Sequence, residues 1–335
     1  AKGLTGWDLV NFALESVAGM DVHPLAVTIA RINYLLAITP HMRGQNPSKI
    51  RLAQLPVYMA DALQTPEREG KNKGTLVIPV DTERGERFSI PEDAALAPAV
   101  FSEVINQMDA FARRPIAEIN TALSGQFGEM VRQRFGAAQR GIVDFSVTYW
   151  AQNLKLLHKL IAEKRNSIWA YVLKNTARPL LLSAQKFDVI AGNPPWLTYK
   201  AIKDRTYQAE VKTLALEYGL IESRDRKQFS NIELSTLFMA HVEEVYLKSG
   251  GLIAFVMPRS TITGAKQHRL FQARGLTRVL DLLGVRPLFN VPTAVLIKQA
   301  GQAAADTVPT TAYTAQLPAH QMRLTEASPR LKTTT

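Results

Sequence analysis

Residues 187–196 read Phe187-Asp188-Val189-Ile190-Ala191-Gly192-Asn193-Pro194-Pro195-Trp196, a short apolar run that ends abruptly on an Asn-Pro-Pro-Trp tetrapeptide. Val189 to Ala191 show no polar alternation, which is typical of a parallel strand covered on both faces. The two prolines prevent the strand from continuing, because proline has no amide hydrogen to donate. Open α/β sheets bind ligands at the carboxyl ends of their strands, so we expect Asn193 to Trp196 to form part of a functional site.

This decapeptide resembles the catalytic motif of the S-adenosylmethionine-dependent methyltransferases that modify exocyclic amines, above all the adenine-N6 DNA methyltransferases. The resemblance implies an α/β fold: a Rossmann-like methyltransferase sheet with helices on both faces. It also implies S-adenosylmethionine as the cofactor, double-stranded DNA as the partner, and a place in a restriction-modification or phage-defence system, with possible partner subunits of a defence complex. The catalytic residues would be Asn193, Pro194, Pro195 and Trp196.

The residue types in the motif suit this chemistry. The amine of adenine is a poor nucleophile because its lone pair is delocalised into the ring. The Asn193 side-chain oxygen and the Pro194 backbone carbonyl can each accept one amine hydrogen and so localise that lone pair. Pro194 and Pro195 fix the backbone that carries both acceptors. Trp196 offers a flat apolar face on which a base swung out of the duplex can stack. The alternative is a stiff loop anchored by a buried indole.

Two acidic residues mark the expected cofactor site. The run Gly19–Val27 resembles a family segment in which a strand ends in an acid before a helix, here predicted from Pro24 to Ile38. The resemblance implies that Asp21, with Val22 beside it, accepts hydrogen bonds from ribose hydroxyls. Asp21 can also be read as a simple helix cap. The strand predicted at Leu55–Leu63 ends in Asp61 and Ala62, which match the segment that lies against the cofactor's adenine. Asn193 completes the expected cofactor contacts.

Further strands and helices alternate after the motif. The turn at 288–293 resembles the family segment that supplies a second aromatic ring against the flipped base, so Phe289 is a candidate stacking partner for Trp196. A phenylalanine in the core is the alternative. We expect helices at Ile232–Leu247 and Gly264–Ala273 and strands at Leu252–Met257, Thr277–Leu283 and Thr293–Lys298.

The predicted organisation has four parts. Residues 1–63 form the first part of the methyltransferase core, with its strands 2 and 3, and residues 186–299 form the second part, with strands 4 to 7. Residues 64–185 form a mainly helical insertion that opens with a hairpin of strands at Thr75–Val80 and Glu86–Pro91. Residues 300–335, rich in Ala, Thr and Pro, are expected to be a linker or extended tail.

The charge distribution favours a polyanionic partner. The formal net charge is +11, and two basic clusters, at residues 155–178 and 259–298, carry most of the excess. We expect contacts with the DNA backbone from Lys200, Arg259, Lys266 and Arg269. Solvated helix faces that only aid solubility are the alternative.

Several classes of protein are disfavoured. The chain has no cysteine, which rules out disulfides and thiolate zinc sites and fits a reducing cytoplasm. Its six histidines show no metal-ligand spacing, so we expect no metal. No apolar run is long enough to suggest a membrane span. With what the resemblance implies, these features lead us to expect a cytoplasmic, DNA-associated prokaryotic protein without a membrane partner.

One element of the family is missing from the sequence. The family's first strand ends in a Gly-rich loop that approaches the methionine part of the cofactor, and this chain contains no such loop. We therefore expect a piece of a longer protein, or missing intervening residues. The leading hypothesis is a site-specific adenine-N6 DNA methyltransferase. The alternatives are an RNA-base or protein-amide methyltransferase, and a non-catalytic DNA-binding subunit with the same fold.

Overall fold

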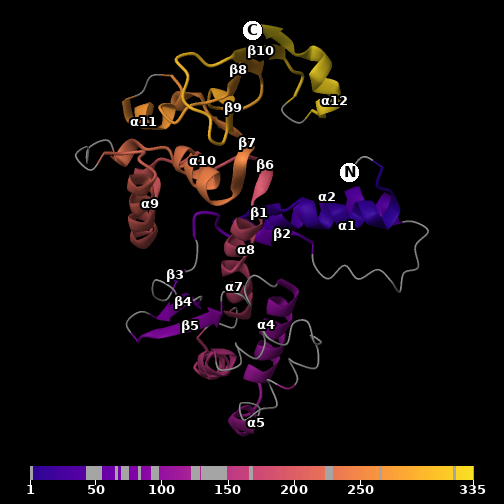
Figure 1. The fold of residues 1–335 in the computed structure, drawn as a ribbon, viewed down its shortest axis with the longest axis vertical. Coiled ribbons are helices and arrows are strands. Elements are labelled where there is room, and N and C mark those ends of the chain that lie inside the picture. The colour runs from indigo at the N-terminus through magenta and orange to yellow at the C-terminus, as the bar shows by residue number, and fades with distance from the viewer. Residues whose placement is uncertain are drawn as a thin grey trace. The chain divides into compact units, whose positions relative to one another are not determined.

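The structure is a computed structural model that describes residues 3–42, 55–64, 67–68, 75–81, 84–91, 98–121, 129, 149–165, 169–222, 229–263, 266–319 and 322–334. Its contacts divide the chain into two compact units, residues 1–184 and 185–335. Each unit has its own sheets and helices (Figure 1). Part of the expected helical insertion, at 92–97, 122–128 and 130–148, lies outside the described residues.

A six-stranded mixed sheet forms the centre of the second unit (Figure 1). Its strand order is β11-β10-β8-β9-β7-β6, and the β6–β7 and β8–β10 pairs are parallel while the other pairs are antiparallel. The sheet contains the strands expected at 187–192, 252–257, 277–283 and 293–298. Their bounds are Phe187–Gly192 for β6, Leu247–Pro258 for β7, Arg278–Arg286 for β8, Thr293–Gln299 for β9, Thr310–Gln316 for β10 and Lys332–Thr334 for β11.

Strand β7 contributes buried apolar side chains to the core beside this sheet. Ile253, Phe255 and Met257 are buried at alternate positions, as the two-residue period of a strand requires. Strand β6 runs parallel to it, with Ala191 paired to Ala254. Gly251 permits the close approach, since a Cβ there would lie 3.0 Å from the carbonyl oxygen of Asp188.

The free edge of β6 departs from the expectation of a strand covered on both sides. No strand within the described residues pairs with the outer edge of β6, and Val189 is 62% exposed. The apolar sequence of this strand therefore correctly predicts a strand, but in the structure the strand lies at an edge.

Helices and short 3-10 turns flank the strands of the second unit. Helix α10 is buried over most of its surface and packs against β7. Asp204 caps α9 by accepting a 2.8 Å hydrogen bond from the backbone amide of Tyr207. The bounds are Tyr199–Ala201 for η3, Arg205–Glu217 for α9, Phe229–Asn231 for η4, Leu234–Val245 for α10, Arg259–Thr261 for η5, Lys266–His268 for η6, Arg269–Gln272 for α11, Leu324–Ala327 for α12 and Ser328–Arg330 for η7.

The structure corrects the expectation that residues 300–335 form only a linker or tail. Strand β10 pairs with β8 in parallel over residues 310–316, and β11 adds to the other edge of β10. The sequence signal for β10 is weak because its residues are mostly half-exposed Thr and Ala, without an apolar run. Backbone pairing to β8 therefore holds this segment more than side-chain burial does.

The first unit begins with two short parallel strands beside two helices. Strand β1, Gly19–Asp21, pairs in register with β2, Val57–Met59, so that Asp21 lies opposite Met59. Helix α1 spans Gly6–Ser16 and helix α2 spans Pro24–Met42. The expected apolar face of α2 is present but exposed, with Leu25, Ile29, Ile32 and Leu36 each at least half exposed to solvent.

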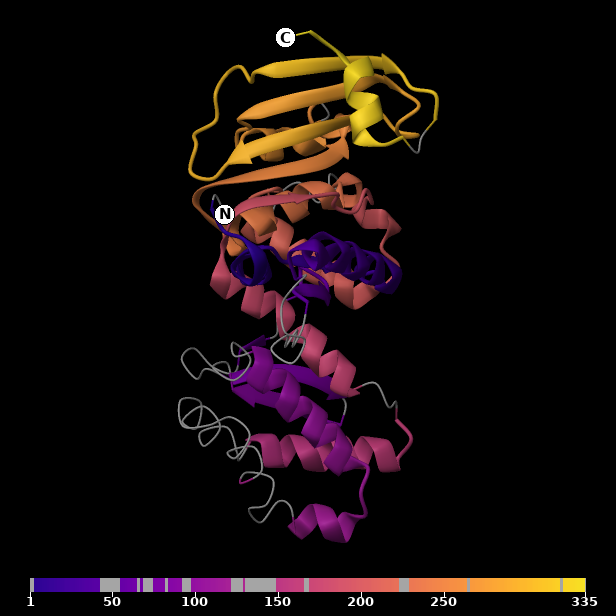
Figure 2. The ribbon, with the colours of Figure 1, turned by 90° about the vertical axis from the view of Figure 1, so that its right-hand side faces the viewer.

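The remainder of the first unit is the insertion, with a small antiparallel sheet next to helices (Figure 2). The expected hairpin is confirmed, because β4 and β5 pair in antiparallel fashion. Buried side chains of this hairpin and of the helices form one hydrophobic core. The bounds are Glu67–Arg68 for β3, Thr75–Asp81 for β4, Glu86–Pro91 for β5, Pro98–Ala112 for α4, Ile116–Thr121 for α5, Trp169–Thr176 for α7 and Arg178–Gln185 for α8, and residues 149–162 are also helical. None of the helices in the described part is long and apolar enough to cross a membrane.

A buried asparagine joins the hairpin to the helix at 149–162. The side-chain oxygen of Asn153 accepts a 3.0 Å hydrogen bond from the backbone amide of Ser89, and its Nδ2 donates at 2.8 Å to the Ser89 carbonyl. Asn153 is 2% exposed. Its carboxamide thus takes the place of a neighbouring strand at the outer edge of β5.

Replacing Asn153 with Leu should leave the amide and carbonyl of Ser89 without partners. We expect a loss of about 1–3 kcal/mol in the free energy of unfolding, measured by urea titration followed by circular dichroism. The control is Gln152→Leu, an exposed neighbour on the same helix, which should change stability by no more than about 0.5 kcal/mol. Equal stability of the Asn153→Leu variant and the parent protein would contradict the role of this bond pair.

Candidate active site

Asn193 to Leu197 leave the sheet at the carboxyl end of β6 in irregular backbone. The side chain of Asn193 is exposed and makes no hydrogen bond within the part of the chain that the structure describes. Pro194 beside it is buried. An amide that is held by a fixed backbone but left without a protein partner remains available to a ligand.

The indole of Trp196 is fixed at two points. Its Nε1 donates a 3.1 Å hydrogen bond to the backbone carbonyl of Val256 on β7, and its ring lies against that of Phe289, with centroids 5.1 Å apart and planes tilted by 59°. The structure therefore brings together the two aromatic residues that the sequence singled out. It also adds Val256, whose role as an acceptor could not be predicted, because it depends on a backbone atom.

Backbone hydrogen bonds hold the chain that follows Trp196. The amide of Leu234 donates to the carbonyl of Leu197 at 2.7 Å, and the amide of Tyr199 donates to the carbonyl of Ile232 at 2.9 Å. Between these two bonds, Thr198 and Glu233 form an antiparallel bridge. The loop is thereby joined to the N-terminus of α10.

Glu233 is an acid in the site that no sequence motif singles out. It is half-buried next to the loop, makes no ion pair with any described residue, and burial raises the pKa of its carboxyl above the ordinary value. The buried environment thus disfavours the charged form of Glu233 at neutral pH.

Glu233→Gln should stabilise the protein at neutral pH. Because the folded-state pKa of Glu233 is raised, the parent protein loses stability as pH rises from the unfolded-state pKa of about 4.3 through the folded-state value. We expect the variant to melt about 1–3 °C higher at pH 7 and at the parent's temperature below about pH 4. Glu326→Gln, at an exposed carboxylate of α12, is the control and should show no such pH-dependent gain. A lower melting temperature of Glu233→Gln at pH 7 would show that the carboxylate has a stabilising partner.

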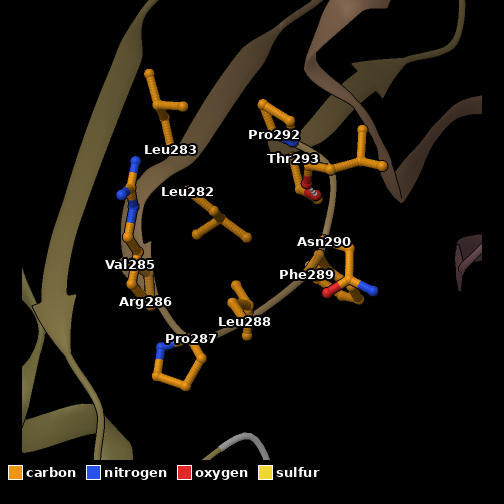
Figure 3. A pocket seen from close by; sticks show the side chains of 11 residues that line it. Leu282, Leu283, Val285, Arg286, Pro287, Leu288, Phe289, Asn290, Pro292 and Thr293 are labelled. Carbon is orange, nitrogen blue, oxygen red and sulfur yellow. Dashed lines mark hydrogen bonds between the residues drawn. The ribbon is translucent and has the colours of Figure 1, made fainter.

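The segment between β8 and β9 encloses a pocket of about 380 Å³. Figure 3 shows Leu282 and Leu288 pointing into the space that this segment surrounds. Phe289, 44% exposed, both lines this pocket and contacts Trp196. The ring of Phe289 thus belongs to a loop with free volume beside it.

Four of the expected cofactor residues, Asp21, Val22, Asp61 and Ala62, lie in the first unit, whereas Asn193 lies in the second. Asp21 is the last residue of β1 and Asp61 lies two residues after the parallel strand β2, and the amide of Ala60 donates to the carbonyl of Asp21 at 3.1 Å. One carboxylate oxygen of Asp21 accepts from the amide of His23 at 2.7 Å, and one of Asp61 accepts from the amide of Leu63 at 2.9 Å. Val22 is exposed beside Asp21, and Ala62 is half-buried.

This arrangement fits the adenosine end of S-adenosylmethionine. The backbone bonds orient each carboxylate at a strand end. The second oxygen of Asp21 is not used by any described residue, so it can accept from a ribose hydroxyl. The helix-cap reading of Asp21 is not supported, because its first oxygen accepts from the amide of His23, before α2, while His23 Nδ1 accepts a 3.2 Å hydrogen bond from the amide of Leu25 in the first turn.

The cations of the two basic clusters differ in how many of them have partners. In the cluster at 155–178, Lys159 and Arg165 pair with Glu86 at 2.7 and 2.5 Å, and these bonds hold the pKa of the Glu86 carboxyl below its usual range. Arg178 is buried, donates to Ser102 and lies over the ring of Tyr58, and its burial lowers the pKa of the guanidinium. Lys174 donates to Asn106 as well, so most cations of this cluster bond within the first unit.

The cluster at 259–298 contains both paired and unpaired cations. Arg259, expected to contact DNA, instead donates to Asp281 at 3.0 Å, and this pairing leaves it less available. Lys200, Lys266 and Arg269 are exposed and pair with none of the described residues. His268 is buried, which lowers the pKa of its imidazole and leaves it uncharged at neutral pH. Among the residues placed by the structure, no group of His, Asp and Glu is arranged to hold a metal ion.

An Asn-Pro-Pro-Trp corner at the carboxyl end of a parallel strand in the second unit, and acids at the carboxyl ends of two parallel strands in the first, are the features expected of a Rossmann-like methyltransferase. The family model described as Eco57I restriction-modification methylase matches residues 15–289, well over half of the chain. The chain belongs to this family.

Solved structures resemble parts of the chain at low identity. The ATP-dependent Type ISP restriction-modification enzyme LlaBIII bound to DNA is 14% identical over 49% of this chain and 13% of that chain, with a TM-score of 0.31. A putative class I S-adenosylmethionine-dependent methyltransferase from Listeria monocytogenes is 13% identical over 54% of this chain and 59% of that chain, with a TM-score of 0.29.

The type IIG restriction endonuclease BpuSI is 14% identical over 70% of this chain and 27% of that chain, with a TM-score of 0.29. The chain thus spans less than two thirds of the length of each of these proteins. No curated protein matches it.

Proposed function

We propose that this chain is the catalytic part of a site-specific DNA methyltransferase that transfers a methyl group from S-adenosylmethionine to the N6 amine of an adenine flipped out of double-stranded DNA, in a restriction-modification or phage-defence system. The observation that carries the proposal is the free Asn193 carboxamide at the end of β6, next to two prolines and an anchored indole. Membership of a restriction-modification methylase family supports DNA as the substrate.

The chain's own groups prepare the amine for attack. One N6 hydrogen is donated to the Asn193 side-chain oxygen and the other to the Pro194 carbonyl, so the nitrogen lone pair turns out of the ring plane. Both acceptors become more strongly bonded as positive charge develops on the nitrogen, which lowers the transition state more than the bound ground state. The cofactor, when bound, supplies an electrophilic methyl group on sulfur.

Asn193→Ala should reduce methyl transfer by about 10²–10³-fold, because one of the two acceptors is lost while the fold is kept. The measurement is tritium transfer from labelled S-adenosylmethionine to duplex DNA by the full-length protein. The control is Gln316→Ala, an exposed carboxamide at the far side of the same sheet, which should retain activity within about twofold. Full activity of Asn193→Ala would refute the assignment.

The aromatic pair must open to admit a base. A base held between two rings needs them about 7 Å apart, twice a stacking distance of about 3.4 Å, whereas the centroids of Trp196 and Phe289 are 5.1 Å apart. Because Trp196 is bonded to β7 and Phe289 lies on a loop beside free volume, we expect Phe289 to move. Trp196 then supplies the fixed face and Phe289 the movable one.

Phe289→Ala should raise the KM for DNA by about 5- to 20-fold, at the lower end of the effect of removing a base-stacking ring. The reason for the lower end is that the substitution also removes a contact that competes with the base. Phe289→Tyr keeps the ring and is the matched control, with a KM within about threefold of the parent's. If both variants methylate DNA with the parent's KM, Phe289 does not contact the base.

A further inference from the structure

A second cavity lies in the sheet-containing unit, away from the aromatic pair. It has a volume of about 310 Å³, which is the lower end of the size range of small-molecule sites and suits one nucleotide-sized group. Its apolar lining comes from three separate segments: Leu220 and Ile221 after α9, Ile232 before α10, and Leu270 on α11. The first three of these side chains are buried.

Two exposed cations line this cavity. They are Lys266 and Arg269, and they have no acidic partner among the residues that the structure places. Glu222 is the acid of the lining, and it belongs to the segment after α9 rather than to that of the cations. A phosphate is therefore attracted to Lys266 and Arg269 and repelled by Glu222.

Ion pairs and hydrogen bonds join the segments that line the cavity to neighbouring elements. Arg274, just after α11, donates to the carbonyl of Tyr218 at 3.0 Å and pairs with Glu243 and Glu244 of α10 at 3.1 Å each. Lys298 pairs with Glu243 at 3.3 Å and donates to the carbonyl of Arg274. The ends of α9 and α11 are thereby tied to each other and to α10, so a ligand meets a site that needs little ordering.

Ile232 links the cavity to the loop that follows Trp196. Ile232 lines the cavity, and its carbonyl accepts the 2.9 Å hydrogen bond from the amide of Tyr199. Tyr199 is three residues from Trp196, a chain span of at most about 11 Å. A group bound in the cavity thus lies within the reach of the strand that presents a base to Trp196.

We propose that this cavity binds one nucleotide of the DNA strand beside the target adenine, with its phosphate on Lys266 and Arg269 and its base against the apolar lining. The inference rests on the proposed function, because it takes the bound strand to be the one that carries the target. On this proposal Lys266 and Arg269 bind a phosphate of the DNA strand, whereas Arg259 is already paired with Asp281.

The test compares two double variants of the full-length protein that lose equal charge. Lys266→Gln/Arg269→Gln removes the two cavity cations. Arg278→Gln/Lys332→Gln removes two exposed, unpaired cations from β8 and β11 of the same unit. Affinity for a fluorescein-labelled duplex is measured by anisotropy between 50 and 200 mM salt.

We expect the cavity variant to bind DNA about tenfold more weakly at 100 mM salt, with the slope of log affinity against log salt reduced by about one, as for one lost phosphate contact. The control variant should bind within about twofold of the parent with an unchanged slope. Equal losses in the two variants would overturn the proposal, since they would indicate a diffuse charge effect.

A third variant, Leu270→Trp, fills the cavity and leaves both cations in place. It should weaken DNA binding about fivefold, and parental affinity in a variant that melts like the parent would overturn the proposal. Deoxyadenosine monophosphate is the other arm of the test. Tight binding of this free nucleotide that requires Lys266 and Arg269, together with parental DNA affinity of the cavity variant, would show a site for a free nucleotide instead.

A methyl-transfer assay distinguishes failure of this inference from failure of the proposed function on which it rests. The cavity variant should show a raised KM for DNA with a kcat within about threefold of the parent's, because the reacting groups are untouched. If the parent protein transfers no methyl group to DNA, the proposed function fails. The anisotropy comparison still decides whether the cavity holds DNA.

Discussion

The parallel pairing of β6 with β7 is the constraint on which the candidate active site depends. It sets the point at which Asn193 leaves the sheet, and it brings the carbonyl of Val256 to the indole of Trp196. Gly251 makes the pairing possible, because a side chain there would meet the backbone of β6. Two prolines then fix the backbone that carries the acceptors, so little reorganisation is needed when an amine arrives. The acceptors are thus positioned by the backbone and not by side-chain packing.

The two aromatic rings proposed to stack on the base, Trp196 and Phe289, differ in how firmly they are held. Trp196 is bonded to the sheet, and the loop after it is bonded to the residues that precede α10. Phe289 sits on the segment between β8 and β9, next to open volume. A fixed acceptor pair with one movable cover combines precise placement of the amine with a route for the base to enter. Burial raises the pKa of the Glu233 carboxyl, so the same loop has a half-buried neighbour whose charged form is disfavoured.

Much of the site could be predicted from sequence, because apolar runs and proline punctuation are local signals. The motif strand, the acids at the ends of β1 and β2, and the hairpin in the insertion all carry such signals. The strand at 310–316 could not be predicted, since its Thr and Ala residues are held by backbone bonds to β8. Which cations remain free could not be predicted either. The partners of Arg259, Arg165 and Lys298 are distant in sequence and are brought close only by the fold.

The central claim is that Asn193 and Pro194 act on the exocyclic amine of adenine. It is tested most directly by incubating duplex DNA with the full-length protein and S-adenosylmethionine that carries a trideuterated methyl group, and then identifying the labelled nucleoside by mass spectrometry. The account predicts that the label appears in N6-methyldeoxyadenosine. Label in methylcytosine, in RNA or in a glutamine side chain, with none in deoxyadenosine, would contradict it.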